Sequence, residues 1–359
     1  MSQLADLSGP SPVAPLSCAV VICAYTFERW DATLEAVNSV RAQQPAPDEV
    51  ILVVDHNEDL RAAFADSLPG VRVVASHNHR GVSGARNAGV ELTTSEVVAF
   101  LDDDAAAEPG WLAVLLPHYA DPDVLGVGSR IEPRWATRRP VWFPPEFDWV
   151  VGCSYTGQAT GVVRNLIGAS SSYRRKTFSG GGFVDGIGRS AGIRIPVGCE
   201  ETEFCIRAGE KWPTGVFIHD DRATVIHRVT PARERFSYFL KRCYSEGLSK
   251  AQMTGRTGKR DGLSAEWRYS AVTLPAGVLR GLGEAVRGEL AGLLTAASII
   301  IGLAVTTGGY GVGSASRRWQ QLRASRSTAS APPVGLPRHL SVSPADTSAR
   351  SPDPEHEGN

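Results

Sequence analysis

The sequence predicts an α/β protein with a doubly wound, mostly parallel sheet and flanking helices. Short apolar runs alternate with helical patterns over residues 17–104, the order that gives parallel strands joined by right-handed crossovers. Two of these runs, 49–55 and 97–104, end in carboxylates. Because ligands bind beyond the carboxyl ends of such strands, we expect Asp55 and Asp104 to open on one edge of the sheet, at one site.

The expected strands are β-rich apolar runs, and the expected helices place apolar residues at helical spacing. The first strand, SCAVVICA, is followed by a loop and a helical pattern through Leu34, Val37 and Val40. A glycine-punctuated loop, HNHRGVSGARNAG, leads into another helix before the run VVAFLDDD. The expected strands cover residues 17–24, 49–55, 71–75, 97–104, 165–174 and 223–227.

Three later segments have a different composition. Residues 130–149 are rich in Pro, Arg and aromatic side chains, which predicts an ordered loop that shapes a pocket beside the site. Residues 178–192 are rich in glycine. Residues 198–208, GCEETEFCIRA, predict the start of a helix, with acids in the first turn where the helix dipole favours them.

The bulk composition suits one large catalytic domain with appendages. Of the 359 residues, 42% are hydrophobic and 21% are charged. The net charge of -1 gives no general attraction to nucleic acid, so we expect no nucleic-acid partner. The six cysteines form no C-x-x-C pair and show no zinc-type spacing, which favours a reduced, cytoplasmic setting.

The chain is expected to divide into four parts. Residues 1–16 lack a basic region followed by an apolar core, so they are typical of a flexible leader and not of a secretory signal. Residues 17–252 would form the catalytic domain, and residues 253–322 a helical, membrane-associated segment. Residues 323–359 are dominated by Ser, Pro, Ala and Arg, which predicts a disordered tail.

The membrane prediction rests on two stretches. Residues 290–316 carry no charge and are long enough to span a bilayer, although their Gly, Ser and Thr lower the hydropathy. Residues 274–287 place apolar residues at helical spacing opposite Arg280, Glu284 and Arg287, which suits an interfacial helix. The alternative is a helical hairpin that covers the main domain.

Two charged stretches have open interpretations. Asp102, Asp103 and Asp104 can hold a hard cation against a diphosphate, or they can form a polar turn that caps a helix beginning near residues 109–111. Residues 222–260 contain ten Lys or Arg against two acids. Such a run is usually a solvated helix face, and the alternative is a surface that faces phosphate.

Five stretches, in this order and at these distances, resemble the motifs of glycosyltransferase family 2 and its GT-A fold: VVICAYTFER, VILVVDHN, NHRGVSGARNAG, VVAFLDDD and GCEETEFCIRA. The resemblance covers residues 17–250. It implies an inverting, nonprocessive glycosyltransferase that uses a nucleotide-diphosphate sugar and a divalent cation, manganese or magnesium. The processive signature Q-x-x-R-W is missing, because residues 315–319 read ASRRW.

The resemblance also implies roles for individual residues. Asp102 and Asp104 take the two ends of the D-x-D motif, whose last acid binds the metal ion, and His227 resembles a histidine that completes the coordination. The implied donor-binding residues are Ala24, Tyr25, Glu28, Asp55, Arg86, Asp102 and Asp103. The alternatives are a plain turn for Tyr25 and Glu28, a helix-surface charge for Arg86 and a structural role for His227.

Glu201 stands where the family carries its catalytic base, with Glu in place of the commoner Asp. Because a general base must reach the acceptor hydroxyl, reach matters more than identity. Glu200 and Glu203 are competing candidates, since these two share a face if the helix has already begun. The implied mechanism is a single displacement in which the base deprotonates the acceptor and the configuration at the anomeric carbon inverts.

The expected function is therefore transfer of a hexosyl or uronosyl group from a nucleotide sugar to a hydroxyl of a lipid-linked or cell-envelope glycan. The expected location is the cytoplasmic face of the cell membrane. One alternative is a catalytically silent module of the same fold that binds sugar nucleotides or lipid, but such a module would have no use for Asp102, Asp104 and Glu201 together. Another is a nucleotidyltransferase, but the glycine-rich, lysine-bearing loop expected after its first strand is missing.

Overall fold

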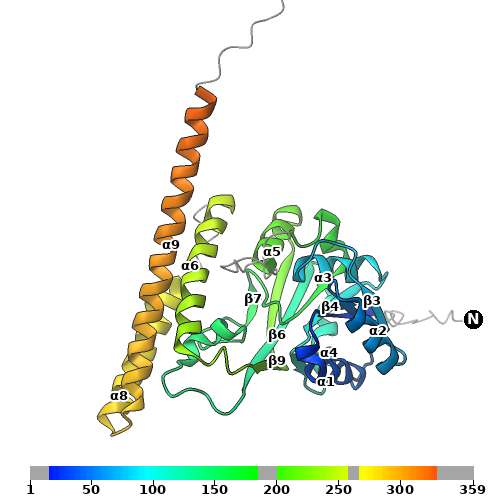
Figure 1. Cartoon of the computed structure of the whole chain (residues 1–359), viewed down its shortest axis with the longest axis horizontal. Coiled ribbons are helices and arrows are strands. Elements are labelled where there is room, and N and C mark those ends of the chain that lie inside the picture. The colour runs from blue at the N-terminus through cyan, green and yellow to red at the C-terminus, as the bar shows by residue number, and fades with distance from the viewer. Residues whose placement is uncertain (1–15, 185–199, 258–266, 330–359) are drawn as a thin grey trace, which may run out of the picture. The chain divides into compact units, whose positions relative to one another are not determined.

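The computed structural model describes residues 16–184, 200–257 and 267–329. Within them, a nine-stranded sheet runs in the order β3-β2-β1-β4-β8-β6-β9-β5, with β7 paired to β9 (Figure 1). The strands are β1 (Cys18–Ala24), β2 (Glu49–Val54), β3 (Arg72–Ala75), β4 (Val97–Asp102), β5 (Ala105–Ala107), β6 (Val124–Trp135), β7 (Gly161–Val163), β8 (Ser170–Arg174) and β9 (Val216–Val229).

The sheet is parallel in its first half and mixed in its second. β3, β2, β1 and β4 pair in parallel, as the sequence predicts. Beyond β4, the pairs with β8 are antiparallel, β6 and β9 are parallel, and β5 and β7 pair antiparallel with β9. The expected α/β fold is confirmed. The parallel pairing that the sequence predicts is found in the half of the sheet formed by β3, β2, β1 and β4.

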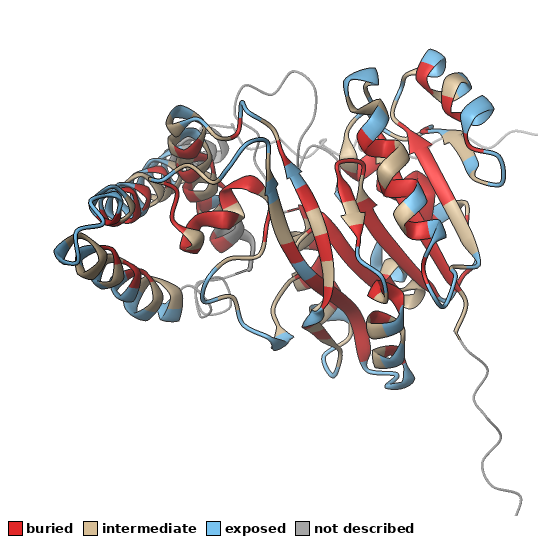
Figure 2. Cartoon of the chain, turned by 90° about the horizontal axis from the view of Figure 1, so that it is seen from below, coloured by how far each residue is buried: buried red, intermediate tan, exposed pale blue. Residues whose placement is uncertain are grey.

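The helices cover both faces of the sheet. Helices α1 (Trp30–Arg41), α2 (Glu58–Ser67) and α4 (Trp111–Leu115) pack on one face, while α3 (Val82–Glu91) and α5 (Glu200–Lys211) pack on the other. Along β1, Val20 and Ile22 pack in the core under α1, α2 and α4, whereas Val21 packs in the core under α3 and α5. Burial on both faces explains why this strand reads as a continuous apolar run, and Figure 2 shows the central strands buried.

Within the described residues of the sheet domain, four short helices lie between the strands and the longer helices. They are η1 (Phe27–Arg29), η2 (Leu116–Ala120), η3 (Pro145–Val151) and η4 (Arg175–Gly180). The prediction of a loop over residues 130–149 is wrong for its first part, because β6 continues to Trp135 and pairs with β9. Only the remainder is a loop with the short helix η3. Of the two predicted segments 178–192 and 198–208, residues 185–192 and 198–199 lie outside the described residues.

The C-terminal helices pack on this domain. They are α6 (Phe236–Thr257), the π-helical turn η5 (Tyr269–Thr273), α8 (Leu274–Val286) and α9 (Ala291–Ala329). A third core joins η3, α6, α8 and α9 through Phe147, Phe239, Leu274 and Ile299. The compact unit extends to Arg317, so the structure places no boundary at residue 252.

Glycines let α9 approach α6 closely. A Cβ at Gly309 would collide with the backbone of Tyr244, and one at Gly313 would crowd Ala251, whereas Gly308 and Gly311 have open space around them. The glycines of α9 therefore fall into two groups, of which one serves helix packing. The helix continues to Ala329, beyond the expected start of the tail at residue 323, and residues 330–359 lie outside the described residues.

Helices α8 and α9 also expose apolar side chains. Helix α8 buries Gly277 and Gly281 and leaves Leu279 and Val286 69% and 89% exposed. In α9, the stretch Ala291–Trp319 is long and apolar enough to cross a membrane, with a mean hydropathy of 1.8 and only 28% of its most apolar window buried. The C-terminal helices thus cover part of the domain and leave an apolar surface uncovered.

Candidate active site

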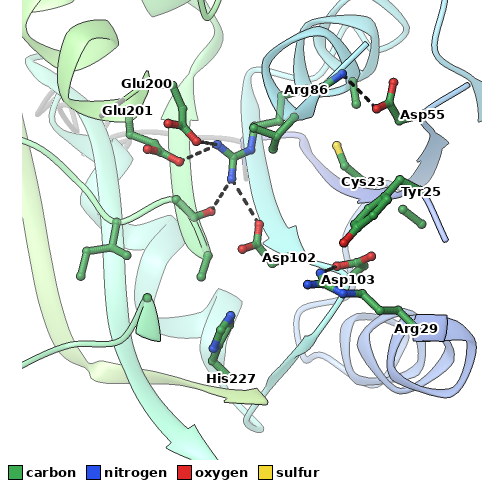
Figure 3. A pocket seen from close by; sticks show the side chains of 18 of the residues that line it. Cys23, Tyr25, Arg29, Asp55, Arg86, Asp102, Asp103, Glu200, Glu201 and His227 are labelled. Carbon is green, nitrogen blue, oxygen red and sulfur yellow. Dashed lines mark hydrogen bonds and ion pairs between the residues drawn. The ribbon is translucent and has the colours of Figure 1, made fainter. Parts of the chain in front are cut away.

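A cavity of about 650 Å³ opens at the carboxyl ends of β1, β2 and β4. The parallel half of the sheet brings Ala24, Asp55 and Asp102 to one edge, whereas Asp104, the acid expected to open there with Asp55, is buried and does not line the cavity. The opposite wall comes from η3, α5, α6 and the end of β9. Figure 3 shows Asp55, Arg86, Asp102, Glu201 and His227 around this space.

Backbone contacts organise one end of the cavity, lined by Tyr25 and Asp55. The Asp55 carboxylate accepts a hydrogen bond of 2.9 Å from the backbone N–H of Gly81 at the start of α3. Gly81 has a φ of 124°, which a glycine adopts at little cost. The Asn57 side chain donates to the carbonyl of Tyr25 at 3.3 Å, so the loops after β1 and β2 are joined.

Glu28 is not brought to the cavity with the other predicted donor-binding residues. It lies exposed in η1, and it does not line the cavity. Its neighbour Arg29 does, and the Arg29 Nη1 lies 2.5 Å from Asp103 Oδ1 and 3.1 Å from Asp104 Oδ2. The turn of η1 therefore directs the Arg29 guanidinium, and not the Glu28 carboxylate, toward Asp103 and Asp104.

Asp102, Asp104 and His227 form a cluster that can hold a metal ion. One ligand atom from each lies within 4.8 Å of the others, and the His227 Nε2 is 3.2 Å from Asp104 Oδ1. The Asp104 Oδ2 is buried and accepts no hydrogen bond among the described residues, although the guanidinium groups of Arg29 and Arg233 lie 3.1 Å and 3.6 Å from it. Two carboxylates and an imidazole suit manganese or magnesium, so the donor set fits a divalent cation.

His227 reaches the carboxylates from the other half of the molecule. It lies near the end of β9, where its register partner on β5 is Ala105, immediately after the acidic run. The His227 Nδ1 lies 3.8 Å from the Cys153 sulfur, which leaves Nε2 directed at Asp104. The helix-capping alternative for the acids is wrong, because Gly110 occupies the cap position of α4 and no side chain caps this helix.

The environment separates the proton affinities of Asp103 and Asp104. Burial, together with the charges of Asp104 and Asp102, raises the pKa of Asp103 to about 7, against the opposing effect of Arg29. Burial would also raise the pKa of Asp104, but the hydrogen bond and charge of His227, with Arg29 and Arg233, lower it well below its usual range. Asp104 is thus held as the carboxylate that a cation requires.

Arg86 lies between Asp102, a predicted donor-binding residue, and Glu201, the predicted base. Its Nη1 is 2.6 Å from Glu201 Oε1, and its Nη2 is 3.2 Å from Asp102 Oδ1 and 3.0 Å from the carbonyl of Gly168 (Figure 3). Burial alone would lower the pKa of this guanidinium. The charges of Glu201, Asp102 and Glu200 outweigh that effect, so the pKa of Arg86 lies above its usual value. The alternative of an exposed helix-surface charge is wrong, because Arg86 is only 3% exposed.

The three glutamates at the start of α5 have different surroundings. Glu200 and Glu201 both line the cavity. The Glu203 carboxylate pairs with Arg207 on the same helix at 2.9 Å and does not line the cavity. Gly168 allows Glu201 to lie close to the backbone, since a Cβ there would collide with the Glu201 carboxylate. The geometry retains Glu201 and Glu200 as candidate bases and removes Glu203.

Trp149, Val151 and Gly152 of the η3 region line the wall opposite Asp55. The Trp149 indole donates to the Tyr269 hydroxyl at 3.0 Å, and this hydroxyl donates to the carbonyl of Glu146 at 2.7 Å. The Glu146 carboxylate is 1% exposed and lies 3.1 Å from the Arg280 guanidinium of α8. Residues from the C-terminal helices therefore support this wall.

Sequence reasoning missed several cavity residues. Arg29 lies inside one of the recognised stretches, and Arg233 and Arg242 lie inside the basic run, for which a phosphate-facing surface is one interpretation. Arg80 and Trp149 gave no separate signal. Cys23 also lines the cavity, but burial raises the pKa of its thiol to about 12, which disfavours a nucleophilic role.

Known proteins resemble the chain in sequence and fold. The model of glycosyl transferase family 2 matches residues 19–180. A glucosyl-dolichyl phosphate glucuronosyltransferase of Haloferax volcanii is 36% identical over 245 residues, which cover 66% of this chain and 77% of the relative. A pre-mycofactocin glycosyltransferase of Mycobacterium tuberculosis is 46% identical over 88 residues, covering 23% of this chain and 18% of that protein.

A solved structure has the same fold. A mannosyltransferase of Pyrobaculum calidifontis, in complex with GDP-Man and Mn2+, superposes with a TM-score of 0.51 at 16% identity, covering 84% of this chain and 91% of the other. The sequence similarity extends across most of the Haloferax relative, and the family model includes the ends of β1, β2 and β4 that open into the cavity. The chain belongs to glycosyltransferase family 2 and is a glycosyl-transfer enzyme.

Proposed function

We propose that the chain moves a sugar from a nucleotide-diphosphate donor to a hydroxyl of a lipid-linked glycan, with inversion at the anomeric carbon. The observation that carries the proposal is that one buried guanidinium, Arg86, contacts both Asp102 and Glu201. This shared contact supports the assignment of Glu201 as the base, because it brings Glu201 and Asp102 to the same guanidinium. Donor and acceptor groups can therefore meet in one cavity.

The donor would lie along the strand ends. Ala24, Tyr25 and Asp55 line the end that suits the nucleoside. Asp104 and His227, with Asp102 beside them, would hold a divalent cation, which supplies charge neutralisation of the departing diphosphate. Arg86 and Arg233 add positive charge near the same carboxylates.

Glu201 would take the proton from the acceptor hydroxyl as this oxygen attacks the anomeric carbon. The bond between the anomeric carbon and the nucleoside diphosphate breaks in the same step, and the diphosphate leaves with the bonding electrons. Arg86 keeps the Glu201 carboxylate directed into the cavity during this step. The choice of Glu201 over Glu200 rests on its shorter contact with Arg86, 2.6 Å against 4.0 Å.

The lipid-linked acceptor is supported by the similarity to the Haloferax relative, a glucosyl-dolichyl phosphate glucuronosyltransferase. The exposed apolar side chains of α8 and α9 give a second reason, because a surface of this kind suits contact with a membrane. Arg317, Arg318 and Arg323 follow the apolar stretch, in agreement with the positive-inside tendency. We infer that these helices hold the domain at the cytoplasmic face of the membrane.

The function is tested by screening the purified full chain against a panel of nucleotide sugars, with manganese or magnesium and with glycosylated polyprenyl phosphate acceptors. We expect one donor to react, and NMR of the product to show the anomeric configuration opposite to that of the donor. A product with the donor configuration would refute the single displacement. Failure of every glycosylated lipid acceptor, with transfer to another acceptor, would refute the proposed acceptor class.

Membrane attachment is tested by fractionating cells that produce the wild-type chain. A variant carrying Leu279→Gln, Leu282→Gln and Val286→Gln changes the side chains that α8 exposes. We expect the wild type in the membrane fraction and a larger soluble share of the variant. Wild-type protein found entirely in the soluble fraction without detergent would contradict the assignment and leave the transferase function untouched.

A further inference from the structure

Five arginines line the cavity, and they differ in what compensates their charge. Arg29, Arg86 and Arg233 lie within 4.0 Å of the carboxylates described above, and Arg80 donates to the carbonyl of His56. Arg242 has neither an ion pair nor a hydrogen bond among the described residues, and its Nε is buried. A buried donor of a charged group without a partner is costly, so this guanidinium is suited to a bound anion.

Arg242 lies at the end of the cavity away from the nucleoside residues. It sits on α6, whose Phe239 and Cys243 share a core with Val150 and Val151 of η3. Trp149 and Val151 line the cavity together with Arg242. Tyr25 and Asp55 follow β1 and β2, which lie near one end of the strand order, whereas α6 follows β9, which lies near the other end.

The same helix lies against the apolar helix α9. Gly309 of α9 approaches the backbone of Tyr244, which is two residues from Arg242, and Gly247 approaches the backbone of Thr306. Earlier in α9, Ile300 and Ile301 are 57% and 40% exposed. Arg242, whose charge has no partner among the described residues, thus lies on α6, the helix that connects the cavity with the surface of α9 proposed to contact lipid.

We propose that Arg242 binds the phosphate of the lipid-linked acceptor. This inference rests on the proposed function and adds the group that the enzyme recognises besides the acceptor sugar. In a lipid phosphosugar, the anionic phosphate separates the sugar from the apolar chain. With the sugar hydroxyl at Glu201, the phosphate lies at Arg242 and the chain continues toward α9. The guanidinium offers several N–H donors to phosphate oxygens.

The donor diphosphate is the other source of phosphate, and kinetics separates the two. Arg242→Gln is compared with wild type on a glycosylated polyprenyl phosphate and on a neutral alkyl glycoside that carries the same sugar. We expect the KM for the phosphate acceptor to rise at least about tenfold, the loss expected for a charged hydrogen-bond partner. The KM for the neutral glycoside, the donor KM and the rate of donor hydrolysis should stay unchanged.

Two further variants complete the test. Lys241→Gln removes a positive charge from the adjacent, exposed position of α6 and should change none of these constants. Arg242→Lys keeps the charge with fewer donors and should give an intermediate KM for the phosphate acceptor. It also provides a readout if Arg242→Gln unfolds, which thermal melting would reveal.

The outcomes distinguish the proposals. An unchanged KM for the phosphate acceptor in both Arg242 variants overturns the assignment of Arg242, and so does an equal rise for the neutral glycoside. A rise in donor KM with slower donor hydrolysis assigns Arg242 to the leaving diphosphate and overturns the inference as well. Wild-type enzyme that transfers to the neutral glycoside but to no lipid phosphate refutes the proposed function itself.

Discussion

The Nη1 of Arg86 lies 2.6 Å from Glu201 Oε1, so an arginine from helix α3 fixes a carboxylate 115 positions further along the chain. The other nitrogen of the same guanidinium reaches Asp102 at 3.2 Å. One buried side chain therefore connects the end of β4 with the start of α5. Through it, the Asp102 carboxylate is joined to the carboxylate of Glu201, the proposed base.

Arg86→Ala should destabilise the protein and abolish transfer. Removing one partner of a buried ion pair leaves carboxylates without compensation, which costs about 3 kcal/mol or more of unfolding free energy. Chemical denaturation followed by circular dichroism measures this change. Arg61→Ala is the control, because Arg61 pairs with Glu58 on the exposed surface of α2 and its loss should leave the midpoint unchanged. Equal midpoints for Arg86→Ala and wild type would contradict the prediction.

Glu201→Gln should cut turnover by about 100-fold or more while leaving nucleotide binding nearly intact, which is the signature of a lost general base. Glu203→Gln is the matched control, since this carboxylate pairs with Arg207 outside the cavity. Turnover and nucleotide affinity are measured separately for both variants and for Glu200→Gln. An active Glu201→Gln enzyme beside an inactive Glu200→Gln enzyme would move the base to Glu200.

Asp104→Ala should remove the manganese dependence of nucleotide diphosphate binding and abolish transfer. The substitution takes away one of the three groups that can hold the ion, and it frees Arg29 and Arg233 from their shared carboxylate. Calorimetric titration with and without manganese measures the effect. Binding as tight as that of wild type in manganese would mean that Asp104 does not hold the cation. With wild type, a chelator should weaken the binding in the same way.

Gly309→Ala should destabilise the protein, whereas Gly308→Ala should be neutral or slightly stabilising. A Cβ at Gly309 meets the Tyr244 backbone, and such overpacking costs about 1–3 kcal/mol. Gly308 has open space, so alanine there gains up to about 1 kcal/mol of helix propensity. Thermal unfolding of the two variants compares them directly. The same melting temperature for both would show that α9 does not pack on α6 as described.

The parallel half of the fold and its acids could be predicted because the signal is local. Each of β1, β2 and β4 is a short apolar run, and parallel pairing alone brings Asp55 and Asp102 to one edge. Strand β6 is not among the predicted strands, and its last part lies in the segment 130–149, for which the sequence predicts a loop. Pro133 and Arg134 argue against a strand locally, and they belong to one because β9 pairs with them from a distant part of the chain.

The remaining cavity residues depend on contacts that no local pattern encodes. Glu28 and Arg29 are neighbours in one short helix, and the turn of the backbone decides that Arg29 faces Asp103 and Asp104. Arg233 and Arg242 share a basic run with solvated side chains, and tertiary packing selects these two for the cavity. A sequence pattern identifies the type of charge but not the partner that lies opposite.

The hydrogen bonds of Tyr269 make the C-terminal helices a working part of the catalytic domain. A chain cut at residue 252 would lose both Tyr269 and Arg280, leaving the Trp149 indole without its acceptor and the buried Glu146 carboxylate without its cation. Shortening the enzyme in this way would therefore remove contacts that support the cavity wall formed by Trp149 and its neighbours. Substitutions on the exposed face of α8 test the proposed membrane contact while leaving these internal contacts in place.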